Sequence, residues 1–378
     1  MPDRTCPFRR ISRRSKIMAT ALASQPPARW VRPEIHALTA YHVPANTGMV
    51  KLDAMENPYS WPDDLRDPWL QSLRNAALNR YPDPEAQALK EKLREFLGLP
   101  PDAGLLLGNG SDELIQMILL TVAGQGRCVL APEPTFAMYR IIAQCVGLRF
   151  VGVPLCSSDF ALDLEAMLAA IARHQPAAVF LAYPNNPTAN LFARSDIERI
   201  LRASPGVVLI DEAYHEFSKA TFLPDLSSYP NLLILRTLSK CGLAGLRVGA
   251  LVGAWDWIRE INKVRLPYNL NTLSQASALF MLGHVRVLEQ QIARICADRE
   301  RLAERLDAMP QIKLWPSKTN FLTLVNKRRD DLADRLKQKG VLIKDLTGAH
   351  PLVEGCIRVT VGTPEENEIV LQALASVG

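Results

Sequence analysis

Five side chains with complementary chemistry fall in one stretch of this sequence. Asp211 follows an apolar run, VVLI, and Arg247 ends the motif GLAGLR. Between them, a second apolar run, LLIL, comes shortly before Thr237, Ser239 and Lys240. A carboxylate beside an aromatic ring nitrogen keeps that nitrogen protonated, and a desolvated lysine amine is a good nucleophile towards an aldehyde. Hydroxyls and a planar guanidinium suit a phosphate. The group therefore indicates a site for an aromatic aldehyde that carries a phosphate.

The apolar runs around these residues must form strands for the group to assemble. VVLI, LLIL and VGALVG have the length and composition of buried strands. Ligands of an open α/β sheet bind beyond the carboxyl ends of parallel strands, so we expect the five side chains to face one crevice. Taken singly, Lys240 could be a solvated charge and Asp211 a turn or helix cap. Together they favour pyridoxal phosphate, with Asp211 at the ring nitrogen, Lys240 at the aldehyde and Arg247 at the phosphate.

Three motifs in fixed order carry a resemblance to a known family. D-E-A-Y at 211–214, T-L-S-K at 237–240 and G-L-A-G-L-R at 242–247 are similar to the signature of fold-type I aminotransferases, closest to the histidinol-phosphate aminotransferase branch of the class II group. Further matches extend from about Leu38 to the C-terminus. The resemblance implies an α/β fold: a large domain with a mostly parallel seven-stranded sheet between helices, and a smaller α+β C-terminal domain.

The order of the patterns predicts where these domains lie. Apolar strands alternate with amphipathic helices up to Gly253, and helices then dominate until short strands return near the C-terminus. We predict a basic, disordered extension over residues 1–28 and an N-terminal arm of the small domain over 29–60. The large cofactor-binding domain is expected over 61–283 and the small domain over 284–378.

A glycine turn before a helix predicts the seat of the cofactor phosphate. The strand LLL enters Gly108-Asn109-Gly110, Ser111 is suited to cap the next helix, and that helix is expected to begin at Asp112. The first turn of a helix offers unpaired N–H groups to an anion, so we expect the backbone N–H groups of Ser111 and Asp112 to bind the phosphate. The motif N-R-Y-P-D resembles the family segment that reaches across a dimer interface, which implies that Tyr81 contacts the cofactor phosphate of a partner subunit.

The resemblance assigns further contacts to the cofactor ring. It implies that Phe136 stacks on the ring, where many relatives carry tyrosine. Asn186 and Tyr214 would bind the ring's 3-oxygen. The spacing from Lys240 to Arg247 is seven residues, one fewer than in many relatives, so a shorter loop must bring Arg247 to the phosphate. Tyr214 is counted with Lys240 and Asp211 among the residues expected to act in catalysis.

Another set of matches concerns the substrate. The resemblance places Tyr41 and Asn57 at the mouth of the substrate pocket, although an aromatic such as Tyr41 could equally be a packing residue. Arg358, in I-R-V-T-V-G, resembles the arginine that binds the anionic end of the substrate. Lys344 stands where relatives often have arginine, and it keeps the charge without the planar fork. Asn186 would also line this pocket.

Composition limits the remaining possibilities. Eight Lys and Arg residues against one acid give residues 1–32 a charge of +7, so the net charge of +5 leaves about −2 for the rest, which does not favour nucleic-acid binding. No apolar run has the roughly 18 residues of a membrane span. Seven scattered cysteines without a C-x-x-C pair indicate reduced thiols and a cytoplasmic protein. No metal site is predicted.

The resemblance implies an aminotransferase, active as a homodimer, that takes L-histidinol phosphate as amino donor and 2-oxoglutarate as acceptor in histidine biosynthesis. Lys240 would be the general base and then the general acid. An aromatic or broad-specificity aminotransferase and a threonine-phosphate decarboxylase remain alternatives on the same fold. A cofactor-binding regulator without catalysis is a further alternative, but the basic tail is too short for a helix-turn-helix module and Lys240 is present.

Overall fold

The computed structural model describes residues 29–40, 48–327 and 331–376. The chain divides into two units, residues 1–43 and 44–378. In the first unit, the described part contains one short helix, α2 (Pro33–His36). The predicted extension over residues 1–28 and the predicted pocket residue Tyr41 lie outside the described residues.

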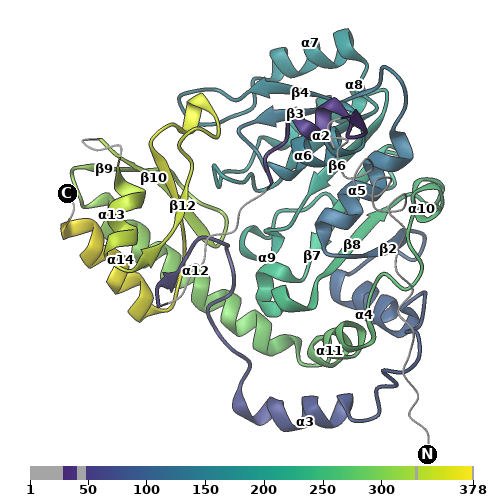
Figure 1. The fold of residues 1–378 in the computed structure, drawn as a ribbon, viewed down its shortest axis with the longest axis horizontal. Helices are drawn as coiled ribbons and strands as arrows, with labels where there is room; N and C mark the ends of the chain where they lie inside the picture. Colours follow the sequence, from purple (N-terminus) through teal and green to yellow (C-terminus); the bar gives the residue numbers. More distant parts are fainter. Residues whose placement is uncertain (1–28, 41–47, 328–330, 377–378) are drawn as a thin grey trace, which may run out of the picture. The chain divides into compact units, whose positions relative to one another are not determined.

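The second unit is built on a seven-stranded mixed sheet (Figure 1). In spatial order, the strands are β2 (Gly104–Asn109), β8 (Val248–Gly253), β7 (Leu232–Thr237), β6 (Val207–Asp211), β5 (Ala178–Ala182), β3 (Cys128–Glu133) and β4 (Arg149–Pro154). β8 is antiparallel to both of its neighbours, and the other pairings are parallel. The predicted fold class is confirmed for this sheet.

Helices cover both faces of the sheet, and alternation along each strand decides which face a side chain reaches. One face packs against α5 (Ser111–Val122), α6 (Met138–Cys145) and α10 (Trp255–Asn262). The other packs against α4 (Gln87–Leu97), α7 (Leu164–His174) and α8 (Arg194–Ala203). In β5, Phe180 belongs to the first cluster, whereas Val179 and Leu181 belong to the second. The central strands β5, β6, β7 and β8 are buried on both faces of the sheet, which explains their continuous apolar sequences.

A smaller sheet forms from the C-terminal part of the chain. It is antiparallel, in the order β12 (Lys344–Asp345), β13 (Cys356–Thr360), β10 (Phe321–Asn326) and β9 (Ile312–Leu314). Its helices are α13 (Leu332–Gln338) and α14 (Pro364–Ser376), with a short turn of helix at Pro351–Val353. The N-terminal strand β1 (Val50–Lys51) pairs in parallel with β11 (Val341–Leu342). The chain therefore returns an early segment to its last region.

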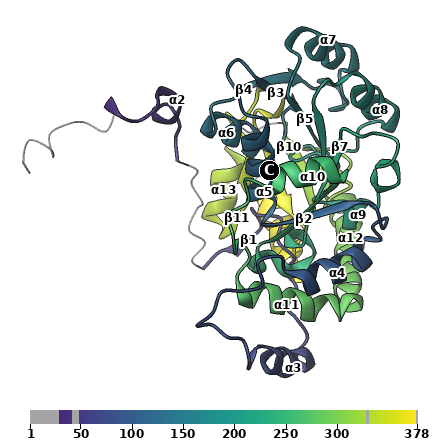
Figure 2. The same cartoon turned by 90° about the vertical axis from the view of Figure 1, so that its right-hand side faces the viewer.

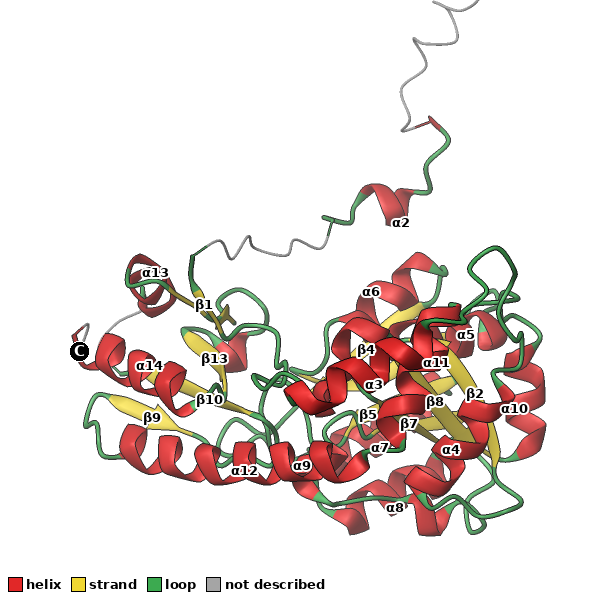
Figure 3. Cartoon of the chain, turned by 90° about the horizontal axis from the view of Figure 1, so that it is seen from below, coloured by secondary structure: helices red, strands yellow, loops and turns green. Residues whose placement is uncertain are grey.

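Three more helices frame the two sheets. α3 (Asp63–Leu73) and α11 (Thr272–Leu282) lie side by side (Figure 2). The long α12 (Val285–Asp307) packs on β9 and β10 of the small sheet and reaches the short α9 (His215–Ser218) beside β6 (Figure 3). α12 thus connects the smaller sheet to the loop that follows β6.

Two helices begin later or earlier than the sequence pattern favours. Pro84 suits the first turn of a helix and Asp83 suits its cap, but Ala86 is left-handed, with φ of 47°, and α4 begins at Gln87. Asp83 still serves this end, because its carboxylate accepts from the backbone N–H of Gln87 at 2.7 Å. α5 begins at Ser111 and not at Asp112, with Gly110 as the residue before it.

Candidate active site

A cavity of about 560 Å³ opens beyond the carboxyl ends of β5, β6 and β7. The cavity brings together ten of the residues that the sequence predicts: Ser111, Asp112, Phe136, Asn186, Asp211, Tyr214, Thr237, Ser239, Lys240 and Arg247. Met55, Ala182, Pro184 and Ala213 complete its lining. The expectation that the acid, the hydroxyls, the lysine and Arg247 share one crevice is therefore met.

Asp211 is the buried carboxylate of this cavity, with 5% of its surface exposed. Its Oδ2 accepts a hydrogen bond from the Tyr139 hydroxyl at 2.6 Å, and its Oδ1 accepts from the Ala213 backbone N–H at 3.0 Å. Burial raises the pKa of Asp211 to about 6, and these two hydrogen bonds oppose the shift. The sequence reading missed Tyr139. The available signal was its position three residues after Phe136, which comes two residues before α6, whereas Tyr139 lies in the first turn of that helix.

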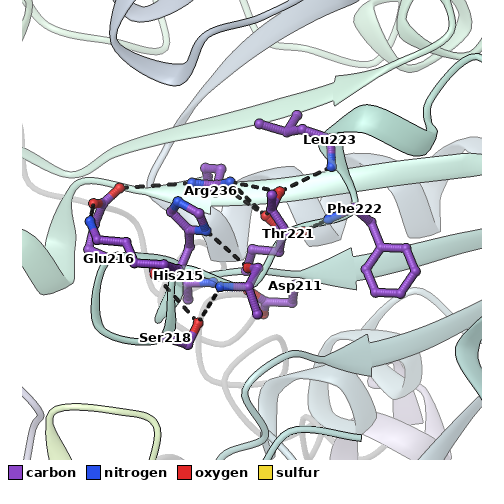
Figure 4. Close-up of polar contacts among 12 residues, drawn as sticks. Asp211, His215, Glu216, Ser218, Thr221, Phe222, Leu223 and Arg236 are labelled. Carbon is purple, nitrogen blue, oxygen red and sulfur yellow. Dashed lines mark hydrogen bonds and ion pairs between the residues drawn. The ribbon is translucent and has the colours of Figure 1, made fainter. Parts of the chain in front are cut away.

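A buried ion pair joins the residue after β6 to Arg236 of β7 on the other face of the sheet. Figure 4 shows Arg236 in contact with Thr221. Because side chains alternate, Asp211 faces α6 whereas Glu212 faces the opposite side. The Glu212 carboxylate accepts from Arg236 Nε at 2.8 Å, and the Arg236 side chain is 7% exposed. Thr237, next to Arg236, turns back to the cavity. The pair therefore fixes the two strand ends that supply the acid and the hydroxyls.

The same glutamate anchors the loop that carries Tyr214. Glu212 also accepts from the Phe222 backbone N–H at 2.7 Å and from the Thr221 hydroxyl at 2.9 Å. His215 adds a contact from its Nδ1 to the Ala220 carbonyl at 3.0 Å. Burial raises the pKa of Tyr214 far above its ordinary value, so its phenol remains protonated and can donate a hydrogen bond into the cavity.

Lys240 lies just beyond the end of β7, in a turn of π-helix over Ser239–Leu243. Its Nζ donates to the Ala54 carbonyl at 3.1 Å. Burial, followed by the positive charge of Arg358, lowers the pKa of Lys240 to about 8. A larger fraction of this amine is therefore neutral at physiological pH than for an exposed lysine, as a nucleophile or base requires.

The short loop after Lys240 still brings Arg247 to the cavity. Within this loop the backbone turns at two residues with positive φ, Gly242 at 121° and Arg247 at 53°. Arg247 Nη1 lies 3.4 Å from Ser239 Oγ, and its Nη2 lies 3.6 Å from an Asp112 carboxylate oxygen. A Cβ at Gly110 would fall 2.4 Å from Arg247 Nη2, so only glycine allows this approach.

One end of the cavity has the donors that a phosphate needs. The first turn of α5, at Ser111 and Asp112, presents backbone N–H groups and the positive end of the helix dipole. Thr237 and Ser239 add hydroxyls, and these two hydroxyls are 2.9 Å apart. Arg247 adds a guanidinium. Asp112 Oδ1 is buried and has no hydrogen-bond partner among the described residues, and burial raises the pKa of this carboxyl.

A second cationic group approaches from the smaller sheet. Arg358 of β13 is 8% exposed, donates from Nη1 to Asn186 Oδ1 at 2.5 Å and donates from Nη2 to the Asp53 carbonyl at 2.9 Å. Lys344 lies directly opposite Arg358 in the antiparallel pairing of β12 and β13, so the two side chains leave the same face of the sheet. The predicted substrate residues Asn186, Lys344 and Arg358 thus share one region.

Two predicted residues lie elsewhere. Asn57 is not part of the cavity lining, and its Nδ2 donates to the Cys241 carbonyl at 3.2 Å and to Gln291 Oε1 at 2.8 Å. Asn57 therefore contacts the backbone next to Lys240. Tyr81 is 78% exposed and stacks on Tyr268 with ring centroids 4.3 Å apart. An exposed pair of aromatic rings is compatible with a cross-subunit contact.

The described residues contain no group of three or more His, Cys, Asp or Glu side chains placed to hold a metal ion. Within the same ranges, no helix combines the length and apolarity that a membrane crossing requires.

The donor set fits pyridoxal phosphate. A buried carboxylate that still has acceptor capacity can face the ring nitrogen, a buried lysine of lowered pKa can face the aldehyde, and the helix terminus with Arg247 can receive the phosphate. Phe136 supplies an aromatic ring to the same cavity.

Comparisons with known proteins agree with this chemistry. The family model of class I and II aminotransferases matches residues 47–374. The chain is 52% identical over 349 residues to histidinol-phosphate aminotransferase 2 of Nitrosococcus oceani, covering 92% of this chain and 97% of that one. It is 50% identical over 353 residues to histidinol-phosphate aminotransferase 1 of Ralstonia nicotianae, covering 92% and 94%.

A solved structure extends the likeness to three dimensions. The histidinol-phosphate aminotransferase from Sinorhizobium meliloti, in complex with pyridoxal-5'-phosphate, matches with a TM-score of 0.80 and 25% identity. The match covers 92% of this chain and 98% of that one. The chain therefore belongs to the class I and II aminotransferases and is a pyridoxal-phosphate-dependent transaminase.

Proposed function

We propose that this protein transfers an amino group between L-histidinol phosphate and 2-oxoglutarate, a step of histidine biosynthesis. The observation that carries the proposal is the shared cavity of Lys240 and Asp211, with Arg358 close enough for its charge to lower the pKa of Lys240. Relatives that are 50% and 52% identical over 92% of the chain carry the name histidinol-phosphate aminotransferase. A cytoplasmic location agrees with such a role.

The cavity offers a contact for each part of the cofactor ring. Asp211 would hold the ring nitrogen, Phe136 would stack on the ring, and Asn186 and Tyr214 would donate to the 3-oxygen. Asn186 is already in contact with Arg358, so the same residue links the cofactor to the substrate. When bound, pyridoxal phosphate supplies an electron sink that makes the neighbouring C–H bond of the amino substrate acidic.

The phosphate would lie at the other end of the cavity. Its ligands would be the backbone N–H groups of Ser111 and Asp112, the hydroxyls of Thr237 and Ser239, and the Arg247 guanidinium. The Asp112 carboxylate lies close to Arg247 and orients it. Tyr81 would add a hydroxyl from a partner subunit, which requires a homodimer.

Lys240 would move the protons of the reaction. Its Nζ is buried and its pKa is about 8, so the amine can take the proton from the substrate carbon that bears the amino group and then return it as an acid. The Ala54 carbonyl, 3.1 Å from Nζ, orients the amine. Tyr214, protonated throughout, acts only as a hydrogen-bond donor.

The substrate's anionic end would bind at the smaller sheet. Arg358 and Lys344 leave one face of that sheet, and two cations suit either a phosphate monoester or a carboxylate. One pocket can then accept L-histidinol phosphate and 2-oxoglutarate in turn. In this proposal, residues 61–283 form the large domain, whereas 284–378, with the arm over 29–60, form the small one.

A comparison of amino donors tests the proposal. The purified protein, supplied with pyridoxal phosphate and 2-oxoglutarate, should form glutamate fastest with L-histidinol phosphate and much more slowly with phenylalanine. Threonine phosphate should give neither glutamate nor carbon dioxide at a comparable rate. Faster turnover of phenylalanine, or release of carbon dioxide without any need for 2-oxoglutarate, would overturn it.

A further inference from the structure

Tyr139 is a buried hydroxyl that touches the acid of the cavity and has no part in the proposed reaction so far. It is fully buried, and its hydroxyl donates to Asp211 Oδ2 at 2.6 Å. The ring is fixed from two sides: it stacks on Phe180 of β5, with centroids 4.9 Å apart, and meets Phe136 edge-on at 5.5 Å. Its position is therefore set by packing, independently of any ligand.

The hydrogen bonds that Asp211 accepts occupy part of the acceptor capacity of its carboxylate. A carboxylate offers about four acceptor sites, two on each oxygen. Among the described residues, Oδ2 accepts from Tyr139 and Oδ1 accepts from the Ala213 N–H. Both donors come from the protein side, and Asp211 also lines the cavity. The remaining capacity can receive one N–H of a ring placed in the cavity.

We propose that Tyr139 is a positioning residue for the cofactor: its hydroxyl holds Asp211 as a carboxylate in one orientation, ready to receive the protonated ring nitrogen. The inference rests on the proposed function only through the cofactor, which the family shares.

Tyr139 also contacts both of the side chains, Phe136 and Asp211, that are proposed to contact the cofactor ring. Phe136 comes two residues before α6 and Tyr139 lies in its first turn, and the Tyr139 N–H donates to the Phe136 carbonyl at 3.2 Å. Tyr139 therefore links the stacking face, through its edge contact with Phe136, to the nitrogen contact, through Asp211.

The electrostatics of Asp211 agree with this role. Burial favours the neutral acid, and the hydrogen bond from Tyr139 is the largest influence that opposes burial. The other charged or titratable groups that face Asp211 are Asp112 at the start of α5, Lys240 after β7 and Tyr214 on the loop after β6. A neutral Asp211 could not hold a pyridinium, so loss of the Tyr139 hydroxyl should move the onset of cofactor loss to a higher pH.

The test measures cofactor affinity across pH in Tyr139→Phe, which keeps the ring and removes the hydroxyl. A hydrogen bond to a charged group corresponds to about 10- to 100-fold in affinity, so apoprotein of this variant should bind pyridoxal phosphate about that much more weakly near neutral pH. The decline in affinity on the acid side should begin at a higher pH than in the wild type. Tyr183→Phe is the matched control: Tyr183 is also buried, and it meets Asp211 through its backbone N–H, which donates to the Asp211 carbonyl at 2.8 Å and is unchanged by the substitution.

A double-mutant cycle separates positioning from packing. If Tyr139 acts through Asp211, then Tyr139→Phe should have little further effect on cofactor affinity in an Asp211→Asn background. A loss that is as large in that background as in the wild type would overturn the proposal, as would a Tyr139→Phe protein that binds the cofactor like Tyr183→Phe at every pH.

If Tyr139→Phe does not fold, 3-fluorotyrosine at position 139 retains the ring and makes the hydroxyl a stronger hydrogen-bond donor. This variant should retain cofactor affinity, and its loss of affinity on the acid side should begin at a lower pH than in the wild type. No such shift would refute the role. Failure of the proposed function would look different: the wild type would bind the cofactor normally but reject L-histidinol phosphate.

Discussion

The two ends of the cavity are built in different ways. The cofactor end is supplied by neighbouring strand ends and the turns that follow them, with Asp211 at the end of β6 and Lys240 after β7. The other end joins distant parts of the chain: Arg358 contacts Asp53, which is 305 residues away, and Asn186, which is 172 residues away. The first is built mainly on the large sheet, and residues 52–57 add a contact to Lys240. The second depends on how the smaller sheet and residues 52–57 meet the large sheet. Changes at the first end should affect cofactor chemistry, and changes at the second should affect substrate binding.

Removal of the lysine amine should have the largest effect and should be confined to the cofactor end. Lys240→Ala deletes the proposed nucleophile and base, so we expect turnover to fall by at least about 10⁴-fold with every amino donor. Borohydride should no longer attach the cofactor to the protein, although the noncovalent contacts can still retain it. Lys219→Ala, at an exposed lysine, is the control. Substantial remaining turnover would remove Lys240 from the reaction.

Breaking the ion pair behind the cofactor end should cost more stability than any surface pair. Glu212 and Arg236 are buried, so Glu212→Ala leaves the buried guanidinium with only the more distant Glu216 carboxylate, at 3.8 Å, as an ion-pair partner among the described residues, and should lower the free energy of unfolding by about 3 to 5 kcal/mol. Urea unfolding of the apoprotein measures this change. Arg259→Ala removes an exposed pair with Asp256 and should change stability by about 0.5 kcal/mol or less. Equal effects at the two sites would contradict the anchoring role of Glu212.

The acid at the cofactor end should lower the stability of the apoprotein. The pKa of Asp211 is raised from 3.8 to about 6, so the folded state binds more protons than the unfolded state between these values, and stability falls as pH rises through that window. Above it, the buried charge costs on the order of 2 to 3 kcal/mol. Asp211→Asn should therefore stabilise the apoprotein near pH 7 while it abolishes tight cofactor binding. Unfolding curves across pH would show the gain vanish below about pH 4; a gain that does not depend on pH would contradict this origin.

At the substrate end, Arg358→Lys should affect substrate binding and leave the cofactor end of the cavity unchanged. It keeps the charge and loses the planar fork that reaches Asn186 and Asp53, so KM for both L-histidinol phosphate and 2-oxoglutarate should rise by about 10- to 100-fold. The near-visible absorbance of the bound cofactor should stay unchanged. A variant that instead loses the cofactor would show that the two ends are not independent.

The same contrast explains what the sequence could predict. Asp211 and Lys240 were predictable because Asp211 ends one buried strand and Lys240 comes three residues after the next, and strand ends that meet at one edge need no long-range information. Arg358 was placed through its likeness to a family motif. The contact from Lys240 to the Ala54 carbonyl was not predictable, since it depends on where an irregular segment crosses the cavity. Tyr139 was missed because its apolar surroundings on α6 suggest packing, and only the fold shows that its hydroxyl meets Asp211.

The smallest predicted effect concerns Asn57, which the resemblance assigns to the substrate pocket. In the structure it donates to the Cys241 carbonyl and to Gln291, so its contacts hold the turn that carries Lys240. Asn57→Ala should then lower kcat by about 2- to 10-fold for all donors alike, which is the range of one or two ordinary hydrogen bonds, and leave KM unchanged. Gln291→Ala should have a similar effect, and the double variant should be little worse than either single one. A rise in KM for L-histidinol phosphate alone would return Asn57 to the substrate, and the turn after Lys240 would then need another support.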